Sequence, residues 1–277
     1  MNKIVVAICF FITSLTMAQN ISVLTYNIKY DNPSDAINSW DNRKAFLISQ
    51  LNYNHPDVFG TQEGLFHQLE DIKIGLRSYE YIGKGRDFGD KRGEYTAIFY
   101  NEKRVKCLKN ETFWLSEEPN QPSKGWDAAY NRICTFGVFQ VLNTRTQFMV
   151  FNTHFDHMGD IARRESAVLL LKTIEALNPR KLPVILMGDF NLEINSIGIQ
   201  NILKKFKDSH IEASNNAFGP TGTFNGFYFE KPVTTKIDYI FISDNIITFK
   251  SGILSDSKDC HFPSDHFPIY VELNLKK

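Results

Sequence analysis

Short apolar runs alternate with amphipathic stretches along most of the chain. In the N-terminal half they predict a strand at residues 22–28, a helix at 43–51, a strand at 58–63 and a helix at 65–76. The apolar residues of the last stretch recur at steps of three and four positions and therefore share one helix face. These residues are Leu65, Leu69, Ile72 and Leu76. The order of elements is strand, helix, strand, helix.

The C-terminal half continues this alternation. Further strands are predicted at residues 95–100, 137–142, 148–154, 184–187, 237–242 and 267–275, and helices at 162–177 and 196–206. The helix at 162–177 has the clearest pattern, with Ala167, Leu170 and Ile174 on its inward face. A long polar loop at residues 116–131 ends at Arg132. Loops of this length in compact domains more often carry function than not.

The strand at 184–187 ends in a sharply polar turn. Gly188 lets the backbone turn without a Cβ penalty, and Asp189 and Asn191 then project from the strand end. The carboxylate can bind or orient a water molecule, and the amide can donate and accept hydrogen bonds, which suits attack of water on a phosphate. Taken alone, the stretch also fits an ordinary Asx turn after a strand.

Polar residues stand at the edges of the other apolar strands as well. These are Asn27, Glu63, His154, Asp238, Asp265 and His266. Taken alone, Asn27 fits a turn-forming residue, and His154 fits a surface or core histidine whose hydrogen bonds are satisfied. Asp238, however, interrupts a buried apolar run and needs a partner. If the strand ends gather at one rim, carboxylates, amides and imidazoles form a cluster without cysteine. Its oxygen ligands favour Mg²⁺, with Mn²⁺ or Ca²⁺ as alternatives, over zinc.

The first 18 residues have the pattern of a secretory signal peptide. Lys3 precedes an almost wholly apolar run at residues 4–15, and Thr16-Met17-Ala18 follows. We therefore expect an exported protein, secreted or periplasmic. Residues 19–277 are expected to form one domain, because no linker, charge block or internal repeat divides them. The apolar run is too short for a permanent membrane span, and a lipid anchor at Cys9 is a weaker alternative.

Composition and charge narrow the class of protein. The chain is 43% hydrophobic and has 23 Phe, which is enough for a large core, and its 31 basic residues balance 31 acidic ones. This balance argues against avid non-specific binding of DNA but leaves room for a local basic groove. Cys107, Cys134 and Cys260 show no metal-binding spacing and do not indicate a disulfide framework, although one bridge among them stays open.

Six short motifs, taken in order, resemble those of the endonuclease/exonuclease/phosphatase superfamily, which includes DNase I-like metal-dependent phosphoesterases. They are Thr25-Tyr26-Asn27, Thr61-Gln62-Glu63-Gly64, Asn152-Thr153-His154, Gly188-Asp189-Phe190-Asn191, Lys236-Ile237-Asp238-Tyr239 and Ser264-Asp265-His266. The resemblance covers nearly the whole chain after residue 18. It implies an α/β fold of four layers, α/β/β/α, in which two packed mixed sheets are flanked by helices and the active site lies at one end.

The resemblance also implies roles for individual residues. Glu63 would be the central metal ligand, with Asn27 and Asp265 completing or flanking the metal site. Asp189 would orient or deprotonate the attacking water, and Asn191 would hold a phosphate oxygen. The number of metal ions, one or two, stays open.

Two histidines would take part, each with a carboxylate. His266, polarised by Asp238, would bind or protonate the phosphoryl group, because a carboxylate behind an imidazole raises its basicity and fixes its tautomer. His154 resembles the second catalytic histidine of DNase-like members, with Glu94 as its carboxylate partner. Arg132 resembles a phosphate-contacting arginine that follows a Trp-containing loop in bacterial members, and a surface salt bridge is the alternative for it.

The expected function is hydrolysis of a phosphodiester or phosphomonoester by an exported, divalent-metal-dependent enzyme. The charge balance favours a small molecule or a lipid headgroup as the substrate. A secreted DNase-type nuclease is the alternative, and a catalytically silent binding module ranks last, because every candidate catalytic position is filled. Lys29 stands where abasic-site enzymes tend to have Asp, and the extended signature of inositol phosphatases is absent; both weaken those substrate assignments. We expect a monomer without a permanent membrane span.

Overall fold

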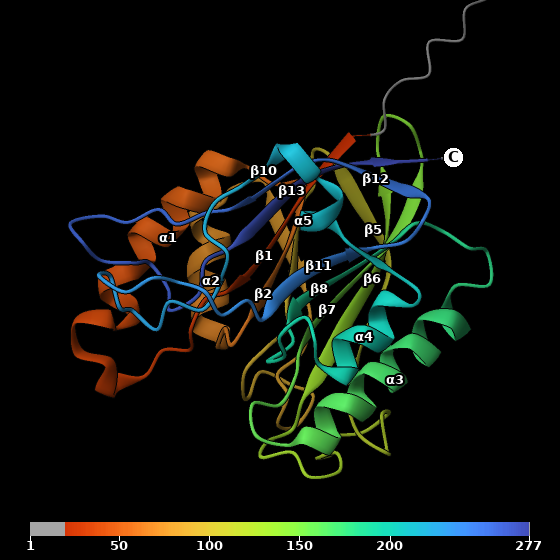
Figure 1. Ribbon diagram of the computed structural model, residues 1–277, viewed down its shortest axis with the longest axis horizontal. Helices are drawn as coiled ribbons and strands as arrows, with labels where there is room; N and C mark the ends of the chain where they lie inside the picture. The colour runs from red at the N-terminus through yellow and green to blue at the C-terminus, as the bar shows by residue number, and fades with distance from the viewer. Residues whose placement is uncertain (1–19, 277) are drawn as a thin grey trace, which may run out of the picture.

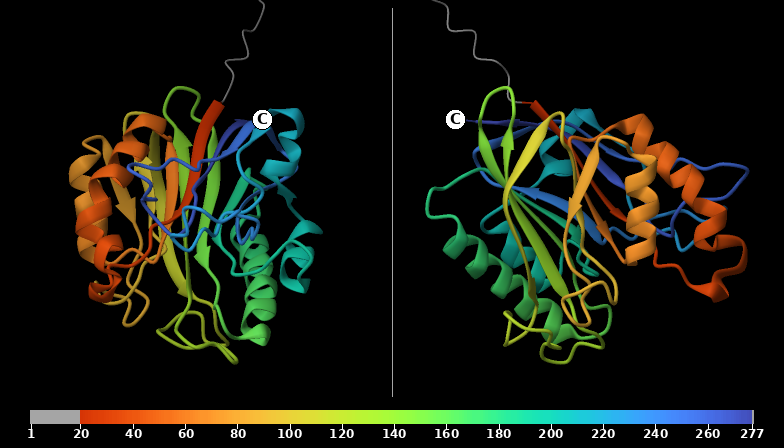
Figure 2. Two further views of the ribbon diagram at one scale, coloured as in Figure 1. Left: turned by 60° about the vertical axis from the view of Figure 1, so that its left-hand side comes forward. Right: turned by 180° about the vertical axis from the view of Figure 1, so that it is seen from behind.

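The computed structural model describes residues 20–276, which form two mixed β-sheets packed face to face with helices on both outer sides (Figure 1). The strand order is β10-β12-β13-β1-β2-β4-β3 in the seven-stranded sheet and β5-β6-β7-β8-β11-β9 in the six-stranded sheet. Helices α1 (Trp40–Asn54) and α2 (Phe66–Gly75) lie on one side, and α3 (Asp160–Leu177) and α4 (Ile197–Leu203) on the other (Figure 2). The predicted α/β/β/α sandwich is confirmed.

The seven-stranded sheet is built around β1, which pairs in parallel with β2 and antiparallel with β13. Its strands are β1 (Asn20–Asn27), β2 (Val58–Gln62), β3 (Tyr79–Ile82), β4 (Ile98–Asn101), β10 (Ala217–Phe218), β12 (Ile246–Ile253) and β13 (Ile269–Leu275). A 3-10 segment, Pro33–Asn38, leads from β1 into α1. The start of β1 lies beside the end of β13, because Asn20 pairs with Asn274. Asn27 therefore lies at the opposite end of the sheet.

The six-stranded sheet is organised around the parallel pair β7 and β8. Its strands are β5 (Val105–Trp114), β6 (Ile133–Val141), β7 (Gln147–His154), β8 (Val184–Asp189), β9 (Lys207–Asp208) and β11 (Asp238–Ile242). Strand β11 runs antiparallel to β8, so that Asp238 lies opposite Asp189. Short helical segments, α5 (Ser209–Glu212) and Ser214–Asn216, follow β9.

Three apolar clusters separate the four layers, and β8 shows how one apolar run serves two of them. Ile185 and Met187 point into the cluster between the sheets, whereas Val184 and Leu186 point into the cluster beneath α3 and α4. Successive side chains of a strand face opposite sides of a sheet, so a strand covered on both faces is apolar throughout. The third cluster fills the space between β1, β2, α1 and α2.

The strands that the sequence pattern missed are the more polar ones. The apolar pattern does not predict most of β5, because residues 106–111 are largely exposed and the strand lies at a sheet edge. Edge strands carry polar residues that limit pairing with other chains, so their apolar pattern is weak. Strands β3 and β12 were also missed, and β12 contains a register shift between Thr248 and Lys250 that interrupts its alternation.

Several predictions concern features other than the sheets. The predicted signal peptide at residues 1–18, with Cys9, lies outside the described residues. Among residues 20–276, no helix combines the length and apolarity needed to cross a bilayer. Cys107, Cys134 and Cys260 are free thiols.

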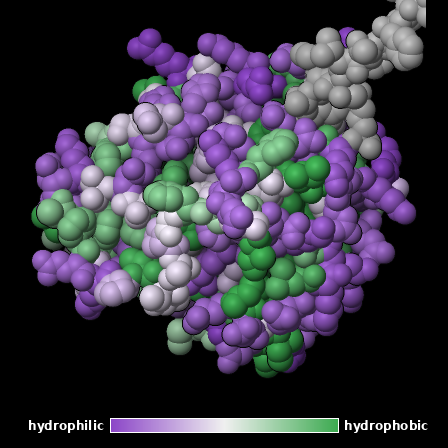
Figure 3. All heavy atoms as spheres, turned by 45° about the horizontal axis from the view of Figure 1, so that its top comes forward, coloured by the Kyte–Doolittle hydropathy of each residue, from purple (hydrophilic) through white to green (hydrophobic). Residues whose placement is uncertain are grey.

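Hydrophilic side chains cover most of the face seen in Figure 3, with hydrophobic ones in smaller groups between them.

Candidate active site

The polar residues predicted at strand ends lie around one pocket. Parallel pairing brings the carboxyl ends of β1 and β2, and of β7 and β8, to the same end of the sandwich, where β11 begins. The pocket has a volume of about 620 Å³. The predicted residues that line it are Glu63, Glu94, Arg132, His154, Asp189, Asn191, Asp265 and His266. Asn27 and Asp238 are buried and hydrogen bonded to side chains of this set.

The backbone at these strand ends is tightly constrained. Glu63 and Asn191 have φ angles of 64° and 48°, in the left-handed region that residues with a side chain rarely adopt. A Cβ atom on Gly188 would lie 2.0 Å from the carbonyl oxygen of Thr153 on β7. Gly188 is still within β8 and does not form the turn that the sequence suggested. Glycine is needed there because β7 and β8 approach each other closely.

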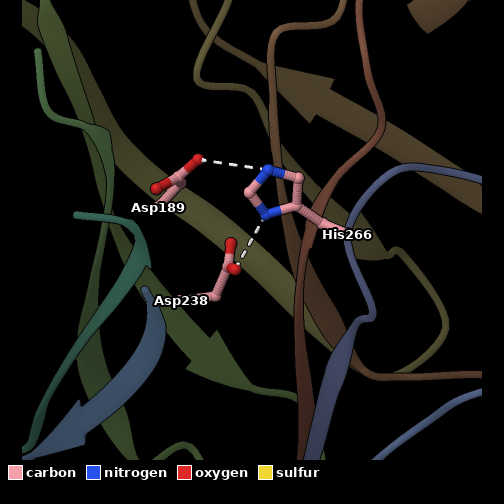
Figure 4. Close-up of side chains that lie close together, drawn as sticks. All are labelled: Asp189, Asp238 and His266. Atoms are coloured by element: carbon pink, nitrogen blue, oxygen red, sulfur yellow. Dashed lines mark hydrogen bonds and ion pairs between the residues drawn. The ribbon is translucent and has the colours of Figure 1, made fainter. Parts of the chain in front are cut away.

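Asp189, Asp238 and His266 form a buried chain of charged groups (Figure 4). His266 Nδ1 lies 2.9 Å from Asp238 Oδ2, and Nε2 lies 3.8 Å from Asp189 Oδ2. Burial opposes a charge on the imidazole, but Asp238, and after it Asp189 and Asp265, raise the pKa of His266 to about 10. The imidazolium is therefore the stable form at neutral pH, and it stands between two carboxylates.

The same three residues offer ligand atoms that lie within 4.8 Å of one another, which is close enough for a metal ion. However, the hydrogen bond to Asp238 already uses His266 Nδ1, and the imidazolium itself balances the carboxylates. Binding a cation here would require His266 to lose its proton against a raised pKa. We therefore interpret this cluster as a proton-holding chain.

Asp189 is held by two donors from opposite sides. Asn27 Nδ2 donates to its Oδ2 at 2.9 Å, and the backbone amide of Asn191 donates to its Oδ1 at 2.9 Å. Burial and the nearby Asp238 charge raise the pKa of Asp189 to about 7, although His266 and the two hydrogen bonds act in the other direction. A carboxylate with a pKa near 7 can exchange a proton with water at neutral pH.

The Glu63 and Asp265 carboxylates are able to hold a cation. Lys29 Nζ lies 3.7 Å from Glu63 Oε2 and 3.7 Å from Asp265 Oδ2, so one positive charge is already accommodated between them. Burial disfavours charge on Glu63, but Lys29 and the hydrogen bond from Asn27 lower its pKa below the ordinary value. Carboxylate oxygens of this kind are ligands for hard divalent cations. The residues present therefore fit such an ion.

Asn27 departs from its expected role as a metal ligand. Its Nδ2 lies 3.0 Å from Glu63 Oε1 and 2.9 Å from Asp189 Oδ2, and its Oδ1 accepts a hydrogen bond from the Lys29 amide at 3.0 Å. The amide therefore turns its nitrogen toward the carboxylates because they are the nearest acceptors. In this arrangement Asn27 orients Glu63 and Asp189 and does not present its oxygen to the cation site.

In the described residues Glu94 pairs with Arg86, and His154 contacts Asn191. Arg86 Nη1 donates to Glu94 Oε2 at 2.6 Å, and the backbone amide of Arg86 donates to the Glu94 carbonyl. The cation that pairs with the Glu94 carboxylate therefore comes from the same loop. His154 Nε2 instead lies 3.1 Å from Asn191 Nδ2. Burial and the charges of Arg132 and Arg86 hold the pKa of His154 well below 6.5, so its neutral ring accepts that hydrogen bond.

Arg132 is buried, which excludes the alternative of a surface salt bridge. It is 5% exposed, its Nε donates to Asp156 Oδ2 at 3.3 Å, and its Nη2 lies 3.0 Å from His157 Nδ1. The ring of His157 stacks on Tyr130, with 5.9 Å between the ring centres. Arg132, His157 and Tyr130 form one wall of the pocket.

Some lining residues were not predicted from the sequence. They are Tyr30, Arg86, Tyr130, His157, Phe224 and Ile237. The long loop at 116–131, whose length suggested a functional role, contributes Tyr130, and His157 follows soon after the predicted His154. Nothing in the local pattern singles out Arg86 or Phe224, because their position depends on how distant segments pack.

Known proteins share both the sequence pattern and the fold. The model of the Endonuclease/Exonuclease/phosphatase family matches residues 24–266. A family protein from Bacteroides thetaiotaomicron has a TM-score of 0.89 and 36% identity, covering 94% of this chain and 99% of that one. A mannosyl-6-phosphatase from the same organism has a TM-score of 0.87 and 37% identity, covering 91% of this chain and 99% of its own.

Curated relatives are more distant and longer. The CCR4-Not complex 3'-5'-exoribonuclease subunit Ccr4 of Mycosarcoma maydis is 23% identical over 94% of this chain and 51% of its own length. The matched region covers only about half to three fifths of the length of these curated relatives. The predicted resemblance is confirmed by the family match and the two solved structures: the chain belongs to the endonuclease/exonuclease/phosphatase family of phosphoester hydrolases.

Proposed function

We propose that the protein is an exported hydrolase that uses a divalent cation to remove phosphate from a small polar molecule by direct attack of water. The observation that carries this proposal is Asp189, whose pKa is raised to about 7 by burial and by Asp238, and which lines the polar pocket. General bases work best when their pKa lies near the working pH. Asp189 is therefore suited to take a proton from the attacking water.

The residues next to Asp189 would stabilise the charge that develops on the phosphoryl group. The protonated His266 lines the pocket with its Nε2 3.8 Å from Asp189 Oδ2, and from there it can donate to a phosphoryl oxygen. Asn191 Nδ2 can donate to a second oxygen in exchange for its hydrogen bond to His154. Donors fixed in advance around developing charge are commonly the largest single contribution to catalysis.

Mg²⁺ is the proposed cation, with Mn²⁺ or Ca²⁺ as alternatives, and Glu63 and Asp265 would hold it. Bound there, the ion would neutralise negative charge on the phosphoryl and leaving oxygens. This assignment is supported by the two carboxylates around the Lys29 ammonium. Lys29 would have to move aside or share the carboxylates with the ion.

A sugar phosphate is the favoured substrate. This is supported by the similarity to a mannosyl-6-phosphatase at 37% identity. Tyr30, Tyr130 and Phe224 line the pocket, and aromatic side chains are common in pockets that bind small polar ligands. The balanced charge of the chain also disfavours a long polyanion. A lipid headgroup would share the phosphate chemistry and remains the second small substrate.

A nuclease is the second candidate function. It is favoured by the similarity to an exoribonuclease subunit, which extends over 94% of this chain. A nuclease would cleave RNA or DNA without releasing inorganic phosphate from a monoester. The two functions therefore differ in their products.

A panel of substrates separates the candidates. The purified protein with Mg²⁺ is offered mannose 6-phosphate, p-nitrophenyl phosphate, bis-p-nitrophenyl phosphate, single-stranded RNA and plasmid DNA. We expect phosphate release from the first two, loss of activity with EDTA, and better recovery with Mg²⁺ or Mn²⁺ than with Zn²⁺. Shortening of RNA or nicking of DNA without release of phosphate from any monoester would refute the proposal in favour of the nuclease.

Export and a monomeric state are part of the proposal. Export is supported by the signal-peptide pattern of residues 1–18. Fusing these residues to a periplasmic reporter enzyme should give reporter activity outside the cytoplasm, and replacing two apolar residues of the run by Arg should abolish it. Light scattering of the purified protein should give the mass of one chain.

A further inference from the structure

One wall of the pocket is built around Arg86, to which the proposed mechanism gives no role. Its guanidinium is held from two directions, because Nη1 donates to Glu94 Oε2 at 2.6 Å and Cζ lies 5.1 Å from the centre of the Tyr130 ring. The backbone is fixed as well, since the Arg86 carbonyl accepts a hydrogen bond from Trp114 Nε1 at 2.7 Å. The side chain is 13% exposed and lines the pocket. It is therefore presented to a ligand in one position.

Arg86 also has an unused donor. Its Nε is buried and makes no hydrogen bond among residues 20–276, although Asp87 Oδ1 lies 3.8 Å away, so this donor is incompletely satisfied. Arg132 lines the same wall and uses Nε for Asp156 and Nη2 for His157. A small void is lined by residues that include Arg86, Glu94, Arg132 and His154, which places the two arginines next to His154.

The positive charge at this wall acts on the centre of the site. After burial, Arg132 and Arg86 are the largest causes of the lowered pKa of His154, which places both guanidinium groups in its field. His154 in turn lies 3.5 Å from Asp189 and 3.1 Å from Asn191. A phosphoryl group bound next to Asp189 would therefore lie near both arginines, with His154 between it and them.

Phosphate monoesters and diesters differ at this point in charge and shape. A monoester has three terminal oxygens and close to two negative charges at neutral pH, because its second pKa is about 6. A diester has one negative charge, and the oxygen that is terminal in a monoester carries a second carbon substituent. Asn191 and His266 can meet two of the oxygens. Arg86 and Arg132 line the same pocket beside His154, so they are donors available for the third oxygen.

We infer that Arg86, positioned by Glu94, selects phosphate monoesters over diesters by donating to the third terminal oxygen and by closing the space that a second ester group needs. The inference rests on the proposed function, because it requires hydrolysis in this pocket. In it, Arg86 contacts the substrate, whereas Glu94 acts through Arg86.

The test compares kcat/KM for p-nitrophenyl phosphate and bis-p-nitrophenyl phosphate in the wild type and in Arg86→Met, Arg86→Lys and Glu94→Gln. The wild type should prefer the monoester. Arg86→Met should lower kcat/KM for the monoester by about 10- to 100-fold, the usual worth of a hydrogen bond to a charged group, and should leave the diester nearly unchanged. Arg86→Lys, which keeps the charge but not the fork of donors, should fall between. Glu94→Gln should lose part of the preference, mainly through KM.

Arg92→Met is the matched control. Arg92 lies in the same loop and pairs with Asp90 at 2.6 Å, but it is exposed and does not line the pocket. This variant should keep the wild-type preference. Inhibition by inorganic phosphate should weaken in Arg86→Met in proportion to the monoester loss, whereas inhibition by dimethyl phosphate should not.

Equal losses on both substrates, or an unchanged preference in folded Arg86 variants, would overturn the inference. If Arg86→Met does not fold, Arg86→Lys and Glu94→Gln still decide the question. A wild type that prefers the diester would also overturn it while leaving the proposed hydrolase intact. A wild type that cleaves RNA and neither of the two test esters would refute the proposed function itself, and with it the inference.

Discussion

Asp238→Asn removes a charge from the buried chain at the centre of the site without changing the shape of the side chain. Asp238 Oδ2 lies 2.9 Å from His266 Nδ1. Burial alone would lower the pKa of His266, but Asp238 supplies the largest of the effects that raise it from 6.5 to about 10. A rise of this size corresponds to roughly 5 kcal/mol in favour of the imidazolium. The amide would give up a large part of it, so that much of the imidazole would be neutral near pH 7.

The effect on catalysis follows from the loss of the imidazolium. His266→Ala should lower kcat by about 10²-fold or more, the usual cost of removing a group that stabilises transition-state charge. Asp238→Asn should cause a large part of the same loss, although Asp238 does not line the pocket. The double variant should be little worse than His266→Ala, because groups that act as one unit are not additive. The assay is steady-state release of phosphate from p-nitrophenyl phosphate at saturating Mg²⁺.

A matched control separates this effect from the general cost of changing a buried carboxylate. Asp208 is buried in the same sheet and accepts a hydrogen bond from Lys236 Nζ at 2.7 Å, but it does not line the pocket. Asp208→Asn should lower the thermal midpoint and leave kcat nearly unchanged. Losses from Asp238→Asn and His266→Ala that multiply in the double variant would refute the reasoning, because they would show that the two residues act independently.

Three further results are expected. Glu63→Gln should abolish activity with an unchanged circular dichroism spectrum, since the amide keeps the shape but loses the charge that holds a cation; near-normal turnover would contradict the metal assignment. Lys29→Met should tighten Mg²⁺ binding in calorimetry by about 2- to 5-fold, because its ammonium lies 3.7 Å from both Glu63 and Asp265; weaker binding would show that Lys29 supports the ion. The stability contributed by protonated His266 should be complete below pH 6.5 and lost as the pH rises through about 10, so the alkaline fall of the thermal midpoint should begin at lower pH in Asp238→Asn; superimposable profiles would exclude His266 as its source.

The sequence was most informative where an apolar strand ended in a polar residue. Asp238 shows why, because a carboxylate in a buried strand must find a partner, and the family resemblance implied that His266, just before another strand, is that partner. The structure brings the two together, 28 positions apart in the chain. Predictions of this kind succeed when burial leaves a residue few alternatives.

The sequence was least informative about contacts made by loops. Glu94 could have paired with any nearby cation, and the geometry of its own loop gives it Arg86 and not His154. Asn27 was predicted as a ligand, but which end of its amide faces the carboxylates depends on the Lys29 backbone amide. These contacts depend on distances of a few ångströms between segments of the chain. The apolar pattern carries no information about how those segments lie relative to one another.

The site requires the two sheets to be held in one fixed relation, and apolar packing alone does not specify such a relation closely. Glu63 follows a strand of one sheet, and Asp189 ends a strand of the other. Asn27 hydrogen bonds to both carboxylates, so it joins the sheets within the site.

A second buried amide joins the sheets beneath the site. Asn152 on β7 accepts a hydrogen bond from Gln62 Nε2 at 2.6 Å and donates to the carbonyl groups of Thr61 and Ala97 at 2.9 and 2.8 Å. A Cβ atom on Gly60 would lie 2.6 Å from Asn152 Cγ, so the amide also needs glycine on the facing strand. Apolar contacts are not directional, whereas these hydrogen bonds form in one register only, and an unpaired buried amide is costly. The asparagine that precedes His154 by two positions therefore serves the chemistry through the alignment of the sheets.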